Sequence, residues 1–319
     1  MYIEKELRER LVRDLGLEMG FIKGRQIQVR NCWHFSTDGN RVDAMFMDDV
    51  DFRNGMNRIF VLSGKYRIVV LAFSLMDTHV HFILYGEFDV CSEFVHEYVR
   101  RTSLSISKRY GEKHKLEKVP IHYQVIDNDY YLKVAICYVY KNAPVSGIPF
   151  TAYDYPWSSC PLLFRRQGYW TFPGWQYDGK SLTDIPVKQR REMLGTRESD
   201  FGNRKMYAGI VWPEEYVAND VVEKIFRTVK TYNYFMCTSK ESDVESKGGL
   251  VSFLSLPMQE MRQHKTEFCQ RMFGVDSVRG LDASSRIKLA RTLKSRFNSS
   301  PRQISRLCGL VYDEVKNLL

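Results

Sequence analysis

The sequence has few of the features that mark secreted, zinc-ribbon or membrane proteins. Its seven cysteines are scattered and never form a C-x-x-C pair, which argues against a zinc ribbon or a disulfide framework. No segment approaches 18 uninterrupted apolar residues, and the charged first stretch MYIEKELRERLVRDLG has no apolar core of signal-peptide length. We therefore expect a cytoplasmic protein with no membrane partner.

The composition is that of a globular protein with a positive net charge. The 319 residues are enough for one large domain or two modest ones, and an apolar content of 44% is ordinary for a globular protein with a core. The 47 Lys and Arg residues outnumber the 38 Asp and Glu residues, giving a net charge of +9. A positive field favours polyanionic partners such as nucleic acid. Many soluble proteins are basic for other reasons, so charge alone does not identify a nucleic-acid-binding protein.

Apolar periodicity and turn residues predict seven elements in the order β-α-β-β-α-β-α. They are a strand at 25–35, a helix at 49–66, strands at 68–76 and 79–85 in a tight hairpin, a helix at 89–110, a strand at 121–126 and a helix at 129–141. This order is that of a ferredoxin-like α+β unit with one extra helix. We expect an antiparallel sheet with helices on one face, a common scaffold that by itself says little about function.

Two histidines on the second strand of the hairpin are candidate metal ligands. His79 and His81 are two residues apart, so both side chains leave the same face of a strand, with Cα atoms about 7 Å apart. Two imidazoles that converge in this way can hold one divalent cation. With seven histidines in 319 residues, about 0.15 such pairs arise by chance, so the pair alone is a modest signal.

The last predicted helix carries a candidate nucleophile. Tyr138 and Asn142 are four residues apart and share one helix face, about 6 Å from each other. If that face packs over the histidines, Asn142 can supply a third metal ligand, and Tyr138 can attack a phosphate that the cation polarises. The alternative is that Tyr138 is an ordinary core aromatic. Tyr140, about 200° away on a helical wheel, is the rival nucleophile.

Three segments resemble one family of DNA-processing enzymes. MDTHVHFILYG is similar to the histidine–hydrophobic–histidine motif of HUH single-tyrosine transposases, and CYVYKNAPVSG followed by DYPWSS is similar to the tyrosine helix of REP-associated tyrosine transposases. VRNCWHFSTDGNRVDAMFMDDVDF resembles that family's first strand, glycine turn and following helix. The resemblance covers roughly residues 25–160 with the motifs in the same order, and as a set they are specific.

The resemblance implies a role for each matched residue. His79 and His81 would be metal ligands, Asn142 a third ligand and Tyr138 the nucleophile. The implied activity is transposase-like nicking and rejoining of single-stranded DNA, often beside a short hairpin, with Mg²⁺ or Mn²⁺ as the cofactor. Tyr138 would become linked to a 5′ phosphate while a 3′ hydroxyl leaves, and the hydroxyl of a second strand could reverse the step.

The chain departs from the family pattern at positions beside these residues. Asp77-Thr78 replaces the usual proline and asparagine before the first histidine, and Asp77 either perturbs the metal or caps the turn. The run Asn142 to Ser146 lacks the arginine of the usual Asn-Pro-Val-Arg-Ala. This difference bears on how the protein would contact its substrate more than on the cleavage chemistry. His34 is left out of the predicted site because a structural histidine in a sheet is the more common case.

Basic residues in two regions are candidate DNA contacts. The helix at 89–110 has a basic side, and the tail at 279–319 holds nine Lys or Arg against three Asp or Glu, a net charge of +6. The spacing of the tail resembles a helix-turn-helix, with a plain helical cap on the catalytic domain as the alternative. The predicted nucleic-acid-binding residues are Arg100, Arg101, Lys108, Arg109, Arg302 and Arg306.

We predict three regions along the chain: a catalytic domain of the HUH type at 1–164, a connecting region of unassigned role at 165–250, and an all-helical C-terminal region at 251–319. Two rival functions remain open. One is a catalytically silent DNA-binding regulator on the same fold, and the other is a relaxase or replication initiator with the same chemistry. The sequence leaves open the DNA sequence recognised, and whether the protein is a monomer or a homodimer.

Overall fold

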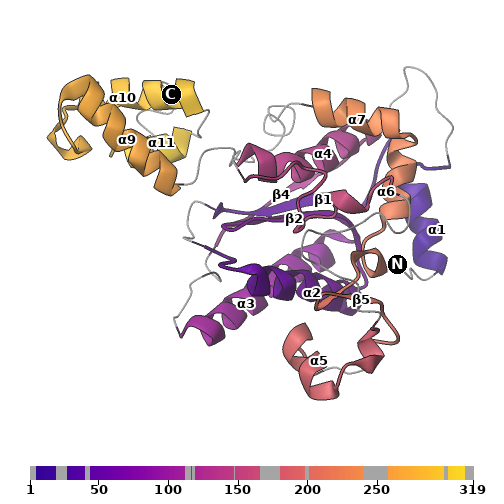
Figure 1. Ribbon diagram of the computed structural model, residues 1–319. Coiled ribbons are helices and arrows are strands. Elements are labelled where there is room, and N and C mark those ends of the chain that lie inside the picture. The colour runs from indigo at the N-terminus through magenta and orange to yellow at the C-terminus, as the bar shows by residue number, and fades with distance from the viewer. Residues whose placement is uncertain are drawn as a thin grey trace. The chain divides into compact units, whose positions relative to one another are not determined.

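The computed structural model describes residues 5–18, 27–39, 44–111, 116, 119–146, 148–165, 180–197, 201–239, 258–297 and 301–312 (Figure 1). The chain divides into two compact units. The first comprises Met1–Lys141 and Phe150–Leu250, and the second comprises Asn142–Pro149 and Val251–Leu319. The candidate histidines and Tyr138 belong to the first unit.

The first unit is α+β and is organised around a four-stranded antiparallel sheet. Its strands are β1 (Cys32–Thr37), β2 (Val69–Leu75), β3 (Val80–Tyr85) and β4 (Ile121–Val125), in the order β2-β3-β1-β4. The four predicted strands are confirmed, but the first begins at Cys32 and not at 25. Asn31 precedes it with a φ of 52°, and this left-handed backbone is incompatible with a continuous strand.

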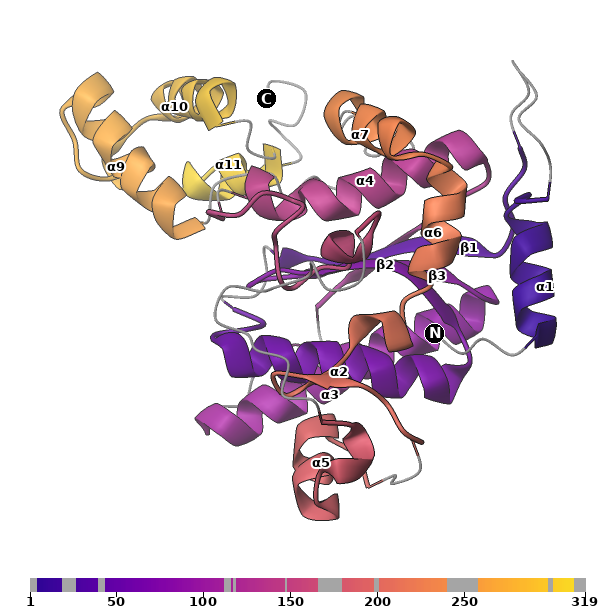
Figure 2. The same cartoon turned by 45° about the vertical axis from the view of Figure 1, so that its right-hand side comes forward.

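Helices cover both faces of this sheet. On one face, Phe82 of β3 contacts Phe94 and Tyr98 of α3 (Phe88–Tyr110), and α2 (Asp49–Tyr66) packs beside α3. On the other face, α4 (Asp129–Val145) brings Tyr138 against the sheet. Figure 2 shows the strands between α4 and the α2–α3 pair. The expectation of helices on one face was therefore wrong, because all residues of β2 and β3 are buried and both faces need a cover.

Local signals account for the ends of these helices. Asp48 caps α2 by accepting hydrogen bonds from the backbone N–H groups of Val50 and Asp51, and Arg67 ends it with a φ of 51°. Gly111 ends α3 with a φ of 67°. The third predicted helix, at 129–141, is α4; it begins at Asp129 as expected but runs to Val145, four residues beyond the predicted end.

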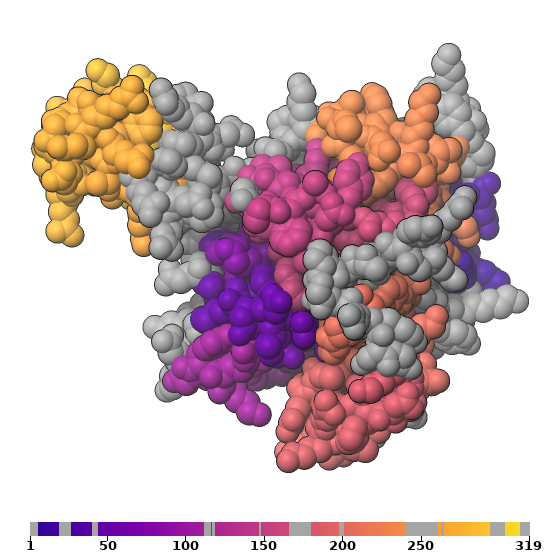
Figure 3. All heavy atoms as spheres, in the orientation of Figure 1, coloured from indigo at the N-terminus to yellow at the C-terminus, as the bar shows by residue number. Residues whose placement is uncertain are grey.

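The described part of the predicted connecting region packs onto the first unit. It contains α5 (Val187–Leu194), the short strands β5 (Met206–Tyr207) and β6 (Ile210–Val211), α6 (Asn219–Phe226) and α7 (Val229–Thr238). The side chain of Asn57 in α2 accepts a hydrogen bond from the backbone N–H of Val211 at 2.8 Å and donates one to the carbonyl of Gly209 at 3.0 Å. Figure 3 shows the α5 segment directly against the α2 segment. This part of 165–250 is therefore a component of the first unit.

The segment that follows α4 continues the sheet at the outer edge of β2. The backbone N–H of Leu75 donates to the carbonyl of Trp157 at 2.8 Å, and that of Ser159 donates to the carbonyl of Phe73 at 3.1 Å. The hydroxyl of Tyr155 also donates to the carbonyl of Leu75. The DYPWSS motif thus protects an edge that would otherwise expose unpaired backbone groups.

The second unit contains the helices α9 (Met258–Phe273), α10 (Ala283–Phe297) and α11 (Pro301–Leu307). Their apolar side chains form one core that includes Leu289, Leu293, Ile304 and Leu307. The predicted final helix with Val315 and Leu318 lies outside the described residues. No helix in the described part of the chain is both long and apolar enough to cross a membrane.

Candidate functional site

The two predicted metal ligands lie side by side at the start of β3. The backbone N–H of Met76 donates to the carbonyl of His79 at 2.8 Å, which closes the hairpin between β2 and β3. His79 is the residue before β3 and His81 is its second residue, with ring centroids 5.0 Å apart. Both side chains are buried. The hairpin therefore converges two imidazoles, as the i and i+2 spacing predicted.

A third histidine, His34 of β1, joins this pair. In the antiparallel register, Ser36 is opposite His81 and His34 is opposite Ile83, so these side chains share one face of the sheet. The Nε2 atom of His34 lies 3.1 Å from Nδ1 of His81 in a buried hydrogen bond. The sequence favoured a structural histidine of the sheet at this position and did not predict its contact with His81. The signal available was the alternation of polar His34 and Ser36 with apolar neighbours in an otherwise buried strand.

In each of the two proposed ligands, the Nδ1 atom makes a hydrogen bond to another residue of the protein. Nδ1 of His79 lies 3.0 Å from the hydroxyl of Thr78, and Nδ1 of His81 contacts His34. A cation bound by this pair would therefore be held through the Nε2 atoms, because the second nitrogen of a metal-bound histidine commonly makes a hydrogen bond to the protein. The carboxylate of Asp77 accepts a hydrogen bond from the backbone N–H of Thr78 at 3.1 Å, so Asp77 caps the turn between β2 and β3.

Gly39 allows the His79 ring to take this position. A Cβ atom at residue 39 would lie 2.9 Å from the hydroxyl oxygen of Thr78 and 3.0 Å from Nδ1 of His79. Both distances are too short for carbon in van der Waals contact. The glycine after β1 is therefore required by close approach to His79.

Tyr138 lies over the histidine cluster, and Tyr140 does not. The ring of Tyr138 is 5.6 Å from that of His81 and 5.7 Å from that of His34, both in edge-on contacts. The Tyr140 hydroxyl accepts a hydrogen bond from Ser159 instead, and burial raises its pKa well above the ordinary value. Of the two rival tyrosines, only Tyr138 contacts the histidines in the described residues.

Asn142 follows Tyr138 by one turn of α4 and is fully buried. The boundary between the two compact units falls after Lys141, so Asn142 is grouped with the second unit. Its role as a third ligand stays a prediction.

Two more polar side chains occupy the same face of the sheet as the histidines. Ser36 is opposite His81, and Gln124 of β4 is opposite His34. Both are buried, and neither Ser36 Oγ nor Gln124 Oε1 has a hydrogen-bond partner among the described residues. A buried polar atom without a partner costs about 1–3 kcal/mol. Such atoms are rare in native cores and often mark functional sites.

The donor set fits a cation site with two histidine ligands. Two imidazoles bound to one cation through nitrogen at about 2.1 Å have ring centroids at most about 6.5 Å apart, and the observed separation of 5.0 Å satisfies that limit. Within the ranges that the structure describes, no group of three or more His, Cys, Asp or Glu residues is arranged to hold a metal. Among these residues, further ligands would have to be of other types, such as the amide of Asn142, or would come from substrate oxygens.

The basic side of α3 is largely compensated by carboxylates. Arg100 and Arg101 both bind Glu97, at 2.6 Å and 2.8 Å. Arg109 binds Asp48 at 2.8 Å and also contacts Asp51. Three of the four predicted DNA contacts on α3 are therefore engaged within the protein, and the fourth, Lys108, is exposed.

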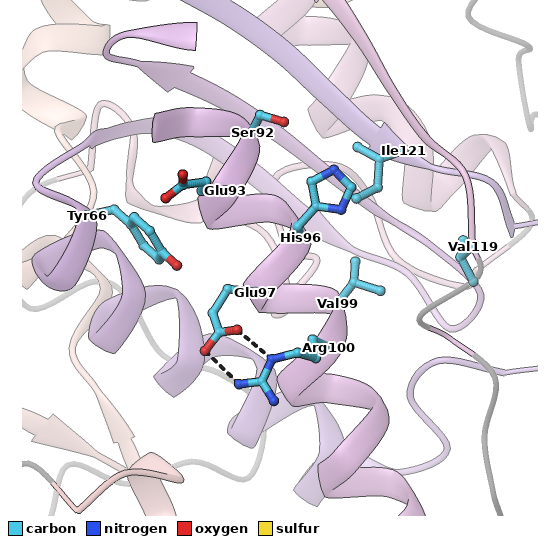
Figure 4. A pocket seen from close by; sticks show the side chains of 9 residues that line it. All are labelled: Tyr66, Ser92, Glu93, His96, Glu97, Val99, Arg100, Val119 and Ile121. Carbon is cyan, nitrogen blue, oxygen red and sulfur yellow. Dashed lines mark hydrogen bonds and ion pairs between the residues drawn. The ribbon is translucent and has the colours of Figure 1, made fainter. Parts of the chain in front are cut away.

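A cavity of about 520 Å³ lies between α3 and β4 (Figure 4). Glu93, His96 and Arg100 of α3 line it together with Ile121 of β4. Ile121 shares a sheet face with Tyr123 and Val125, opposite to that of Gln124. The cavity is therefore on the α3 side of the sheet and is separate from the histidine cluster.

In the second unit, Arg306 is exposed at the end of α11. Arg302 lies in the first turn of that helix, and its side chain is outside the described residues. The guanidinium of Arg286 donates to the carbonyls of Leu281 and Gly309, so this residue ties the two ends of the α10–α11 segment together.

Comparison of the chain with protein-family models, with curated proteins and with solved structures found no match.

Proposed function

We propose that this chain is a metal-dependent, transposase-like enzyme that nicks single-stranded DNA and rejoins it through a covalent bond to Tyr138. The observation that carries the proposal is the edge-on contact of the Tyr138 ring with that of His81, whose own ring is 5.0 Å from that of His79. A tyrosine beside two histidines of one hairpin is the arrangement that this chemistry needs.

The chemistry follows from the residues in this cluster. The phenol oxygen of Tyr138 attacks the phosphorus of a phosphodiester and loses its proton, the bond from phosphorus to the 3′ oxygen breaks, and a 3′ hydroxyl leaves with a proton. The 5′ phosphate stays linked to the tyrosine until the 3′ hydroxyl of a second strand reverses the step. Mg²⁺ or Mn²⁺, when bound by His79, His81 and the predicted third ligand Asn142, would polarise the phosphate.

Two observations support a ferredoxin-like fold for the catalytic unit. The elements follow the order β-α-β-β-α-β along the chain, and the strands lie in the order β2-β3-β1-β4 within one antiparallel sheet. Single-stranded DNA, probed best beside a short hairpin, is the proposed substrate. The net charge of +9 is in keeping with a polyanionic partner. The α9–α11 segment, as part of an all-helical C-terminal region, is a proposed DNA-binding element.

A second candidate is a DNA-binding regulator without catalytic activity, and one observation favours it. The exposed fractions of His79, His81 and Tyr138 are 3%, 0% and 3%, so a strand of DNA must displace some covering part of the chain to reach them. A relaxase or replication initiator would share the cleavage chemistry of the first proposal.

The test is a cleavage assay with labelled single-stranded oligonucleotides carrying a hairpin, in Mn²⁺ and in EDTA. We expect a covalent protein–DNA adduct that forms only with the cation and is absent in Tyr138→Phe. Tyr140→Phe is the matched control, since it also removes one hydroxyl from α4 and should keep the adduct. An adduct that persists in Tyr138→Phe would reject the nucleophile, and its absence from the wild type on every substrate would favour the regulator.

A further inference from the structure

His34 is a buried histidine that the proposed chemistry does not use. It lies in the middle of β1, between β3 and β4, and its side chain is fully buried. Its Nε2 atom is hydrogen-bonded to Nδ1 of His81 at 3.1 Å, and its ring contacts that of Tyr138. This one residue therefore touches both a proposed ligand and the proposed nucleophile.

The bond between the two histidines can hold its proton in two ways. A neutral imidazole carries one proton, on Nδ1 or on Nε2. If His34 donates from Nε2, Nδ1 of His81 is the acceptor and the proton of His81 is on Nε2, where it prevents metal binding. If His81 donates from Nδ1, its Nε2 atom carries a lone pair that can bind a cation. Only the second arrangement is compatible with His81 as a ligand through Nε2.

We propose that His34 is the positioning residue of the metal site: its Nε2 atom accepts a hydrogen bond from the Nδ1–H group of His81, which leaves Nε2 of His81 as the ligating atom. This inference rests on the proposed function, because it assumes that His81 binds a cation. Such hydrogen-bond partners of metal-bound histidines set the tautomer and the ring orientation. The packing of His34 within the sheet gives it a fixed orientation, which a flexible surface partner would lack.

The two proposed ligands differ in how freely their hydrogen-bond partners can change between donor and acceptor. His79 has the hydroxyl of Thr78 beside its Nδ1 atom, and a hydroxyl can rotate to donate or to accept. The ring of His34 cannot rotate in this way without breaking its contacts with His81 and Tyr138. We therefore expect substitution of His34 to affect metal binding more than substitution of Thr78.

The experiment compares His34→Gln, His34→Phe and the wild type. Glutamine can place an acceptor oxygen near the position of Nε2, whereas phenylalanine keeps the ring volume and removes the acceptor. We expect Mn²⁺ binding, measured by electron paramagnetic resonance and calorimetry, to weaken about 10- to 100-fold in His34→Phe and to change much less in His34→Gln. His96→Phe is the control, since it makes the same exchange at an α3 histidine that lines the separate cavity on the other side of the sheet.

Nitrogen NMR of the wild type with Mg²⁺ supplies a readout that does not depend on any variant. The expected spectrum has the His81 proton on Nδ1. A proton on Nε2, Mn²⁺ binding in His34→Phe that equals the wild type, or a loss in His34→Gln as large as in His34→Phe would each overturn the assignment. If the wild type itself binds no cation, the proposed metal-dependent function fails with it, and that outcome is distinct from the other three.

Discussion

Replacing Gly39 by alanine is a sharp steric test of the metal site. The backbone of Gly39 does not adopt a positive φ, so alanine brings no backbone strain and the effect comes from its Cβ alone. That atom would lie 2.9 Å from Thr78 Oγ1, 3.0 Å from Nδ1 of His79 and 3.2 Å from its Cβ. Relief to an ordinary contact of about 3.5 Å requires a shift of about 0.5 Å.

A shift of this size at a ligand has a predictable cost. Binding constellations must be held within about 0.5 Å of their productive geometry, so we expect Gly39→Ala to weaken Mn²⁺ binding about tenfold. Electron paramagnetic resonance of Mn²⁺ in titrations measures this directly. Cleavage of the oligonucleotide should fall in parallel at limiting cation and recover at high concentration.

Gly64→Ala is the matched control. Gly64 also lacks a positive φ, lies in α2, and has nothing within 4 Å of the position where a Cβ would be. Alanine there should leave Mn²⁺ binding unchanged and stabilise the helix by about 0.5–1 kcal/mol. Equal Mn²⁺ affinity in Gly39→Ala and the wild type would refute the reasoning, as would an equal loss in both variants.

Three further predictions concern other parts of the chain. Glu97→Gln should lower the free energy of unfolding at pH 7, measured in urea titrations, by at most about 1 kcal/mol. Hydrogen bonds from Arg100 and Arg101 lower the pKa of Glu97 from 4.5 to about 2. The difference between variant and wild type should therefore be complete above pH 4.5 and vanish toward pH 2. Asn57→Ala leaves the buried N–H of Val211 and the partly buried carbonyl of Gly209 without partners, so urea unfolding should show a loss of about 1–3 kcal/mol, and no measurable loss would contradict the docking of β6 on α2. If the tail binds DNA phosphates, Arg306→Gln should reduce the slope of log affinity against log salt by about 0.7 on single strands, whereas an unchanged slope would point to a helical cap.

The sequence by itself determined the order of the elements from β1 to α4. The predicted helix at 49–66 coincides with α2, because Asp48 and the residues that follow it carry the cap and the first turn. The hairpin at Asp77-Thr78 was predictable from two apolar runs separated by two polar residues. The i and i+2 spacing of His79 and His81 also determined that they converge. All these signals act over a few residues of chain.

Which side chains meet across the fold was decided by the tertiary structure. His34 and His81 are 47 residues apart in sequence, and their hydrogen bond depends on the register between β1 and β3. The distinction between Tyr138 and Tyr140 depends on which side of α4 packs on the sheet. The charge of Arg109 is compensated by carboxylates at the start of α2, about 60 residues earlier in the chain. Strand register and helix packing are set by burial of the whole core, so no local pattern contains them.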